Sequence, residues 1–173
     1  MEAYRLSENI SKFEDLDLSG TYTYADYLTW KFDERLELIK GKVFRMSPGP
    51  NTFHQQISGE VFNCLYNYLR NKSCKVFVAP FDVRFPRRSI DDKEIITVLQ
   101  PDISVFCDLR KIDERGGIGA PDIIIEILSP GNNKKELKAK YEIYEEAGVL
   151  EYWIFHPAER TFLKYTLDEN GRF

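Results

Sequence analysis

The sequence predicts a mixed α/β (α+β) protein in which a β-sheet is flanked by helices. The run from Ile123 to Leu128 is β-branched, almost wholly apolar and closed by Ser-Pro-Gly, which is typical of a strand buried on both faces. Two segments, 51–72 and 134–147, carry apolar residues at helical spacing. With 173 residues and 43% hydrophobic content, the chain is long enough to bury a substantial core around these elements.

The first half of the chain contains two short elements before its long helix. Thr23 is a typical N-terminal cap for a helix to about residue 31. Residues 35–39 and 42–46 flank Lys40-Gly41, which predicts a β-hairpin with glycine in the turn. Asn51 caps the first long helix. Residues 1–20 show weak periodicity, so we expect a loosely structured lead-in followed by a single domain over 21–173.

The second half alternates strands with the other long helix. Pro101 interrupts one strand-like segment, and Gly148 is the expected left-handed end of the second helix. The predicted elements are a strand within 75–85, a charged loop at 87–94, strands within 95–106, a glycine-rich loop at 115–119, the helix 134–147, and strands at 149–155 and 161–167.

Charge and cysteine content narrow the partners and the compartment. The formal net charge of −4 means that the molecule as a whole would not attract nucleic acid without a local positive patch or bound cations. The three cysteines form no CxxC pair, which fits a reducing compartment. No apolar run approaches membrane-spanning length, and the N-terminus has no signal-peptide pattern. We therefore expect a cytoplasmic protein with no membrane partner.

Glu126 interrupts the apolar strand. Period-two alternation places it on the same face as Ile124 and Leu128. A carboxylate there is costly unless it is paired, protonated or bound to a metal. Asp102, which opens the apolar segment after Pro101, is the leading partner, and Asp82 and Glu37 are alternatives; for either of these, an exposed position or a structural ion pair is an equally good interpretation.

Two basic residues stand on buried helix faces. Lys140 is three residues after Leu137 and four before Tyr144, so it projects from within the apolar stripe of its helix. Such a lysine either extends along its stem to solvent or reaches an acidic cluster on the sheet. His54 lies in the first turn of the helix that begins after Asn51, where a hydrogen-bonded core or cap role competes with a ligand role.

Several of these segments together resemble a known family. They are Glu37-Leu-Ile-Lys-Gly41, Met46-Ser-Pro48, His54, Pro101-Asp-Ile-Ser-Val105, residues 119–130, Lys140 to Tyr144, and Gly148-Val-Leu-Glu-Tyr-Trp-Ile154. In these segments the chain resembles the Uma2 family of endonucleases, within the PD-(D/E)XK, restriction-endonuclease-like superfamily. The resemblance runs from about residue 20 to 168, and residues 119–154 are its most specific part.

The resemblance implies a restriction-endonuclease-like core and a phosphodiesterase site that uses a divalent metal ion. It places the motif aspartate at Asp102 and the motif acid at Glu126, with Glu37 as an additional acid. The superfamily lysine would fall at Leu128, and in this family a helix lysine matching Lys140 is thought to replace it.

The resulting hypothesis is a Mg²⁺- or Mn²⁺-dependent endonuclease whose substrate is nucleic acid, with DNA expected over RNA. Asp102, Glu126 and the backbone carbonyl of Ile127 would hold the metal, and Lys140 would orient the attacking water or stabilise the transition state. Glu37 could support a second metal, and His54 could orient an acid or contact phosphate.

Two rival interpretations remain. One is a non-catalytic domain that keeps the fold to bind protein or nucleic acid, with Glu126 and Lys140 as a buried ion pair. The other is a hydrolase of small phosphate esters. The aromatic segment Tyr152-Trp153-Ile154 is interpreted as an edge that could serve a homodimer.

Overall fold

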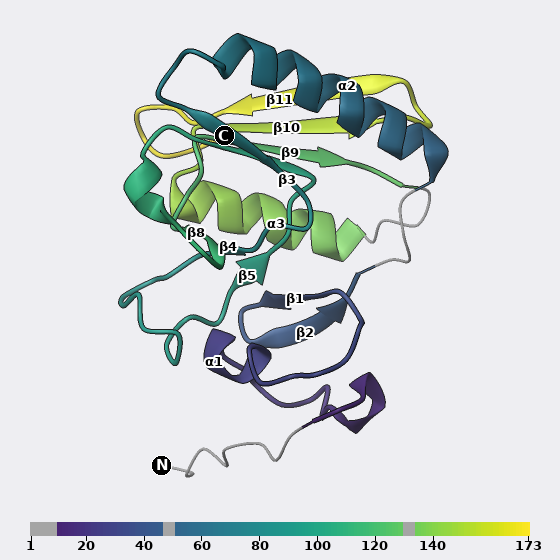
Figure 1. Cartoon of the computed structure of the whole chain (residues 1–173), viewed down its shortest axis with the longest axis vertical. Coiled ribbons are helices and arrows are strands. Elements are labelled where there is room, and N and C mark those ends of the chain that lie inside the picture. The colour runs from purple at the N-terminus through teal and green to yellow at the C-terminus, as the bar shows by residue number, and fades with distance from the viewer. Residues whose placement is uncertain (1–9, 47–50, 130–133) are drawn as a thin grey trace. The chain divides into compact units, whose positions relative to one another are not determined.

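The computed structural model describes residues 10–46, 51–129 and 134–173 (Figure 1). The chain groups into two compact units: unit 1 comprises residues 1–47 and 84–99, and unit 2 comprises residues 48–83 and 100–173. Of the predicted lead-in, residues 1–9 lie outside the described residues, and residues 10–20 contain one 3-10 turn, η1 (Phe13–Asp15). The division at residue 20 between a lead-in and a single domain stays a prediction.

Unit 1 contains one short helix and three antiparallel strands in the order β2-β1-β5. Its elements are α1 (Tyr24–Tyr27), β1 (Leu36–Ile39), β2 (Lys42–Arg45) and β5 (Val98–Leu99). Thr23 and Asp26 form a reciprocal capping box at the start of α1, which is shorter than predicted. The hairpin is confirmed; its turn residues Lys40 (φ 51°) and Gly41 (φ 80°) are both left-handed, as a tight two-residue turn requires.

Unit 2 is built on a five-stranded mixed sheet in the order β11-β10-β9-β6-β3. Its strands are β3 (Lys75–Val78), β6 (Ile103–Phe106), β9 (Ile123–Ile127), β10 (Glu151–His156) and β11 (Thr161–Thr166). The β9–β10 pair is parallel and the others are antiparallel. Parallel neighbours require a crossover connection, which α3 (Lys134–Ala147) supplies. The predicted sheet flanked by helices is confirmed.

The two long helices cover opposite faces of this sheet (Figure 1). Helix α2 (Thr52–Leu69) packs against Ile103, Ile125 and Ile127 through Ile57, Val61, Phe62 and Leu65. On the other face, the ring of Tyr144 from α3 meets that of Tyr152 at a centroid distance of 4.9 Å. The predicted alternation along β9 is confirmed, because its isoleucines at 123, 125 and 127 face α2 while Glu126 faces α3.

The glycine-rich segment predicted as a loop is instead a strand. Residues Gly116–Ile118 form β8, which pairs with β7 (Ile112–Asp113) after the turn η2 (Leu109–Lys111). Gly116 has φ +125°, and a Cβ there would lie 2.2 Å from the carbonyl oxygen of Asp82, so only glycine fits. Glycine permits this close backbone approach, and the strand was missed because a prediction from side-chain pattern reads glycines as a loop.

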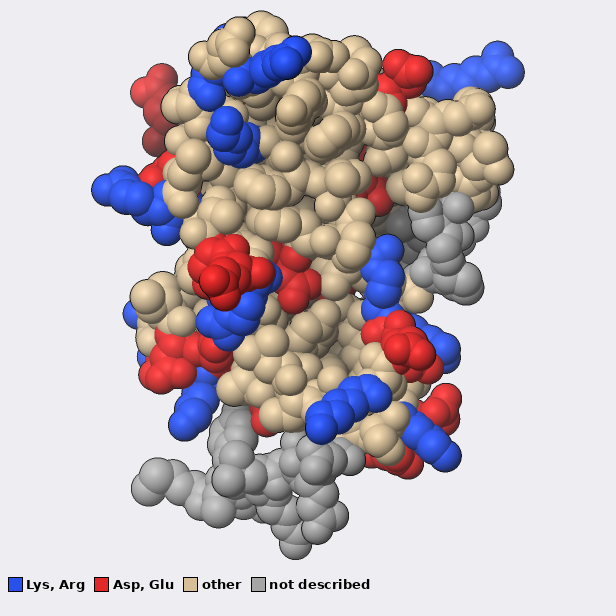
Figure 2. All heavy atoms as spheres, viewed as in Figure 1, with Lys and Arg blue, Asp and Glu red and all other residues tan. Residues whose placement is uncertain are grey.

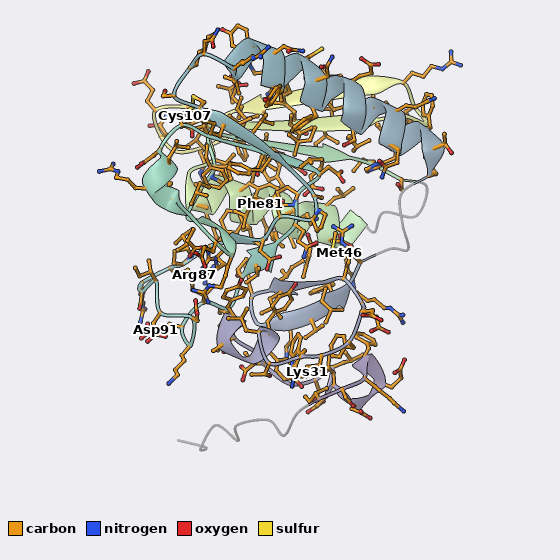
Figure 3. The ribbon with its side chains drawn as sticks, in the orientation of Figure 1. Lys31, Met46, Phe81, Arg87, Asp91 and Cys107 are labelled. Atoms are coloured by element: carbon orange, nitrogen blue, oxygen red, sulfur yellow. A yellow bond between two sulfur atoms is a disulfide. The ribbon has the colours of Figure 1, made fainter. Side chains whose placement is uncertain are left out.

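The segment 75–85 is also divided. Strand β3 ends at Val78, the cis peptide bond Ala79-Pro80 follows, and β4 (Val83–Arg84) comes after it. Phe81, labelled in Figure 3, stacks on Phe77 at a centroid distance of 4.4 Å. The interruption predicted at Pro101 is confirmed, since it separates β5 from β6.

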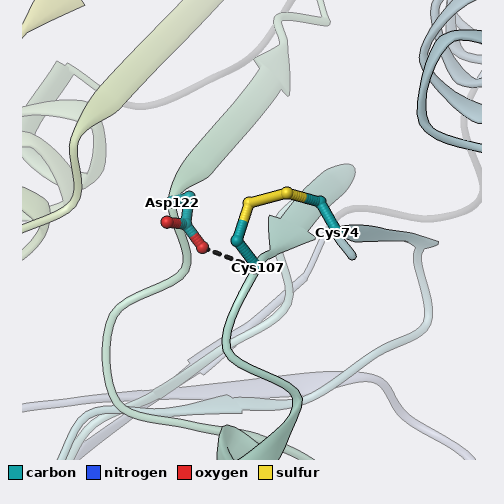
Figure 4. Close-up of a disulfide and its surroundings, with 3 residues drawn as sticks. All are labelled: Cys74, Cys107 and Asp122. Atoms are coloured by element: carbon teal, nitrogen blue, oxygen red, sulfur yellow. Dashed lines mark hydrogen bonds between the residues drawn. A yellow bond between two sulfur atoms is a disulfide. The ribbon is translucent and has the colours of Figure 1, made fainter. Parts of the chain in front are cut away.

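Two of the three cysteines are joined, which the sequence analysis did not foresee. The β3–β6 register, continued by one residue, places Cys74 opposite Cys107, and the two form a disulfide (Figure 4). The amide of Cys107 donates to the carboxylate of Asp122 at 2.7 Å. Cys64 is a free, exposed cysteine. The cytoplasmic location stays a prediction.

The segment 152–154 does not form a sheet edge, so that interpretation was wrong. It lies in β10, which is bordered by β9 and β11, and Tyr152 is fully buried. The homodimer stays a prediction, and this segment no longer supports it. No helix among the described residues is both long and apolar enough to span a bilayer.

Candidate functional site

Glu126 meets two donors from α3 on the face of the sheet that α3 covers. The Tyr144 hydroxyl donates to its Oε1 at 2.7 Å, and the Lys140 Nζ lies 3.1 Å from the same oxygen. Glu126 and Lys140 are 8% and 4% exposed, so this ion pair is largely removed from water. Lys140 also lies 3.8 Å from Glu136, one helical turn away. Of the two placements that the sequence left open for Lys140, the structure shows the one that reaches an acid on the sheet, and the burial explains why both charges need partners.

Asp102 lies at the same end of the sheet as Glu126. It directly precedes β6, whose first residue, Ile103, pairs with Ile125, the neighbour of Glu126 on β9. The Asp102 carboxylate accepts from the Ile127 amide at 2.7 Å, which ties it to the end of β9. Its side chain is 21% exposed, so the cluster reaches solvent at Asp102.

His54 joins the cluster from the first turn of α2. Asn51 caps this helix by accepting from the His54 amide at 2.9 Å, and the imidazole Nε2 lies 3.2 Å from Asp102 Oδ1. The hydrogen bond to Asp102 raises the pKa of His54 above its ordinary value, against the opposing effect of burial, and the charge of Glu126 adds to the rise. The buried Nδ1 has no hydrogen-bond partner among the described residues.

Two tyrosines that the sequence analysis did not propose as site residues lie near Glu126. Tyr144 is fully buried and fixes the Glu126 carboxylate through the hydrogen bond given above. Tyr152 is also fully buried, and burial together with the charge of Glu126 raises the pKa of its hydroxyl well above 10. The signal for Tyr144 was its position four residues after Lys140, on the same helix face.

Glu37 and Asp82 were the other sequence candidates. Glu37 lies on β1 in unit 1, where it is buried and opposite Phe44, and its role as an additional acid stays a prediction. Asp82 accepts from the Gln100 side-chain amide at 2.8 Å, which is a structural contact in unit 2. The structure therefore brings Asp102, Glu126, His54 and Lys140 together.

The donor set fits a hard divalent cation. Mg²⁺ is typically held by one or two carboxylates, with waters and substrate phosphates completing its shell. Asp102 and Glu126 supply two such carboxylates from neighbouring strands. Within residues 10–46, 51–129 and 134–173, no group of three or more His, Cys, Asp and Glu side chains is arranged to hold an ion. The Ile127 backbone carbonyl stays the predicted further ligand.

Comparison with known proteins agrees with this architecture. Residues 24–173 match the Uma2 family profile, described as "Putative restriction endonuclease". The structure is similar to a crystal structure from Anabaena variabilis described as "a putative nuclease belonging to DUF820", with a TM-score of 0.65, 26% identity, and coverage of 84% of this chain and 79% of that one.

A curated relative also matches. It is "Uncharacterized protein slr1290" from Synechocystis sp., 24% identical over 131 residues, which cover 75% of this chain. The chain spans 65% of the length of that relative.

The mixed sheet flanked by helices, the similarity to this nuclease structure and the family match place the molecule among restriction-endonuclease-like nuclease folds. Because the Uma2 profile spans most of its length, the chain belongs to the Uma2 family.

Proposed function

We propose that this protein is a Mg²⁺- or Mn²⁺-dependent endonuclease that hydrolyses nucleic-acid phosphodiester bonds. The observation that carries the proposal is that Asp102, bonded by the Ile127 amide, and Glu126, with Lys140 at 3.1 Å, lie at the same end of two neighbouring apolar strands. Buried charges of this kind destabilise a fold unless they are fully paired, so their concentration at one point favours a functional site. The family to which the chain belongs supports nucleic acid as the substrate class.

Asp102, Glu126 and the Ile127 carbonyl would hold the metal ion, which when bound supplies water activation and neutralises charge on the phosphate. The Ile127 amide, donating to Asp102, fixes the orientation of that carboxylate. Tyr144 does the same for Glu126. Both carboxylates are thus held before substrate arrives, which lowers the cost of reorganisation during the reaction.

Lys140 and His54 are the donors available to the reacting phosphate. The Lys140 ammonium would stabilise negative charge that develops on the phosphoryl oxygens or orient the attacking water. The raised pKa of His54 favours the imidazolium, whose Nε2 lies 3.2 Å from Asp102, so its positive charge stands beside the carboxylate that would hold the metal. These roles distinguish the charged helix residues from the carboxylates of the sheet.

A non-catalytic binding domain is the second candidate, because the Lys140–Glu126 pair is also what that interpretation predicts. The two are separated by incubating plasmid and single-stranded oligonucleotides with pure protein, with and without Mg²⁺ or Mn²⁺. Cleavage should require the metal and should disappear in Glu126→Gln and Lys140→Met. Lys138→Met, on the same helix but 79% exposed at its side chain, should cleave as the wild type does.

Calorimetry provides a test that does not depend on activity. Mn²⁺ binding should be lost in Asp102→Ala and Glu126→Ala. Binding that survives both substitutions unchanged would show that the metal site lies elsewhere.

A further inference from the structure

A hollow of about 320 Å³ lies at the end of β9, beside the first turn of α2 and the turn that joins β10 to β11. All of the residues around it belong to unit 2. They are Asn51, Phe53, Leu128, Pro157, Ala158 and Arg160.

The hollow adjoins the candidate site through two chain neighbours. Phe53 directly precedes His54, whose ring contacts Asp102. Leu128 directly follows Ile127, whose amide donates to the same carboxylate. Consecutive Cα atoms are 3.8 Å apart. If a nucleic-acid substrate binds with one phosphate at Asp102, the next nucleotide along the substrate is within reach of this hollow.

The lining combines an aromatic face with a cation. Phe53 is 56% exposed although it lies on a long, well-packed helix, and Leu128 and Pro157 add apolar surface. Arg160 adopts φ 53° in a turn that is closed by a hydrogen bond, which its backbone amide donates to the Pro157 carbonyl at 3.2 Å. Its guanidinium makes no ion pair with any residue of the described part of the chain. An exposed ring beside an available arginine suits a planar, anionic ligand.

We propose that this hollow binds one unstacked nucleotide of a single-stranded substrate, next to the phosphodiester bond that is cut. The base lies against Phe53, and Arg160 contacts the neighbouring phosphate. The inference rests on the proposed function, because the position of the hollow matters only if phosphate binds at Asp102. Its size falls within the range typical of ligand sites.

Single-stranded nucleic acid is favoured over a duplex for two reasons. The flat face of a base can stack on an aromatic side chain only when the base is not already stacked in a helix. Tracking of a long duplex relies on many phosphate contacts, whereas this chain has net charge −4, and its Lys and Arg are interspersed with Asp and Glu on the face shown in Figure 2. Recognition by one stacked base needs no extended basic surface.

The test is binding of labelled oligonucleotides by fluorescence anisotropy, in EDTA so that no cleavage occurs. DNA and RNA single strands and the matching DNA duplex are compared for the wild type, Phe53→Ala and Arg160→Ala. Tyr68→Ala is the matched control, because Tyr68 is on the same helix and is 69% exposed but does not line the hollow. Circular dichroism verifies that each variant is folded.

Phe53→Ala should weaken single-strand binding by at least about fivefold, since stacking on one aromatic ring contributes about 1–3 kcal/mol, and Tyr68→Ala should leave it unchanged. Arg160→Ala should weaken binding and reduce its salt dependence. Equal losses in Phe53→Ala and Tyr68→Ala, or tighter binding of the duplex than of the single strand, would overturn the proposal. The stronger of the DNA and RNA signals identifies the substrate type.

The proposal about the hollow and the proposal about catalysis can be refuted independently. If the wild type cleaves with metal but Phe53→Ala does not change oligonucleotide binding, the proposal about the hollow is refuted and the nuclease proposal stands. If binding depends on Phe53 but the protein cleaves nothing with any metal, the nuclease proposal is refuted and nucleotide binding in the hollow stands.

Discussion

The ion pair between Lys140 and Glu126 allows structural and catalytic roles to be measured in the same variants. Lys140→Met removes the ammonium and leaves a carboxylate that is 8% exposed, still bound by the Tyr144 hydroxyl. Breaking a buried pair by removing one partner typically costs about 3–5 kcal/mol of unfolding free energy. Glu126→Gln should cost less, because Glu136 remains 3.8 Å from Lys140.

The double variant, Lys140→Met with Glu126→Gln, removes both charges and leaves side chains of similar volume. Replacing a whole buried pair is often neutral or stabilising. We therefore expect the double variant to be more stable than Lys140→Met alone by about 2 kcal/mol or more. Urea unfolding followed by circular dichroism measures this difference. Lys138→Met, whose pair with Glu142 is solvent-exposed, should change stability by less than about 0.5 kcal/mol.

Cleavage by the same proteins then separates the two roles. The double variant should be folded, nearly as stable as the wild type, and inactive. Single substitutions that each cost under about 1 kcal/mol and add without coupling would refute the reasoning about the buried pair. A stable double variant that still cuts nucleic acid would refute the assignment of these residues to the active site.

Three further predictions test other parts of the molecule. Tyr144→Phe should lower stability by about 1.5–3 kcal/mol and weaken Mn²⁺ binding, because it removes a hydrogen bond to a buried carboxylate; urea unfolding and calorimetry measure the two effects, and unchanged values in both would show that Tyr144 does not hold Glu126. The pKa of His54 is raised in the folded protein, so its contribution to stability is fully present below the unfolded pKa of about 6.5 and is lost as pH rises through the folded pKa. Asp102→Asn should lower the pKa of His54 in an NMR titration. The same variant should show a smaller loss of stability over this pH range. Reducing Cys74–Cys107, which are 33 residues apart, should lower stability by about 3–4 kcal/mol in the chain-entropy model, and thiol titration of the unfolded, unreduced protein should find one reactive cysteine and not three.

Much of the local structure could be predicted from sequence because its causes are local. The cap residue Asn51, the Lys40-Gly41 turn and the Gly148 helix end each act through hydrogen bonds or backbone angles within a few residues. The anomaly of Glu126 and the inward projection of Lys140 were visible for the same reason, since periodicity alone assigns a residue to a face.

The elements that were misread depend on contacts between distant segments. Strand β8 consists of glycines and one isoleucine, a composition typical of loops, and it is a strand because the backbone near Asp82 approaches it closely. The disulfide between Cys74 and Cys107 follows from the β3–β6 register, and cysteine spacing cannot reveal that register.

By itself, the sequence determined which residues are anomalous: an acid in an apolar strand, a lysine in an apolar helix stripe and a histidine at a helix start. The tertiary structure alone decided that Asp102 and Glu126 lie at the same end of neighbouring strands, that Tyr144 donates to the Glu126 carboxylate, and that Glu37 belongs to another unit. The physical reason is that periodicity assigns a side chain to a face, whereas strand register and helix packing decide which faces meet.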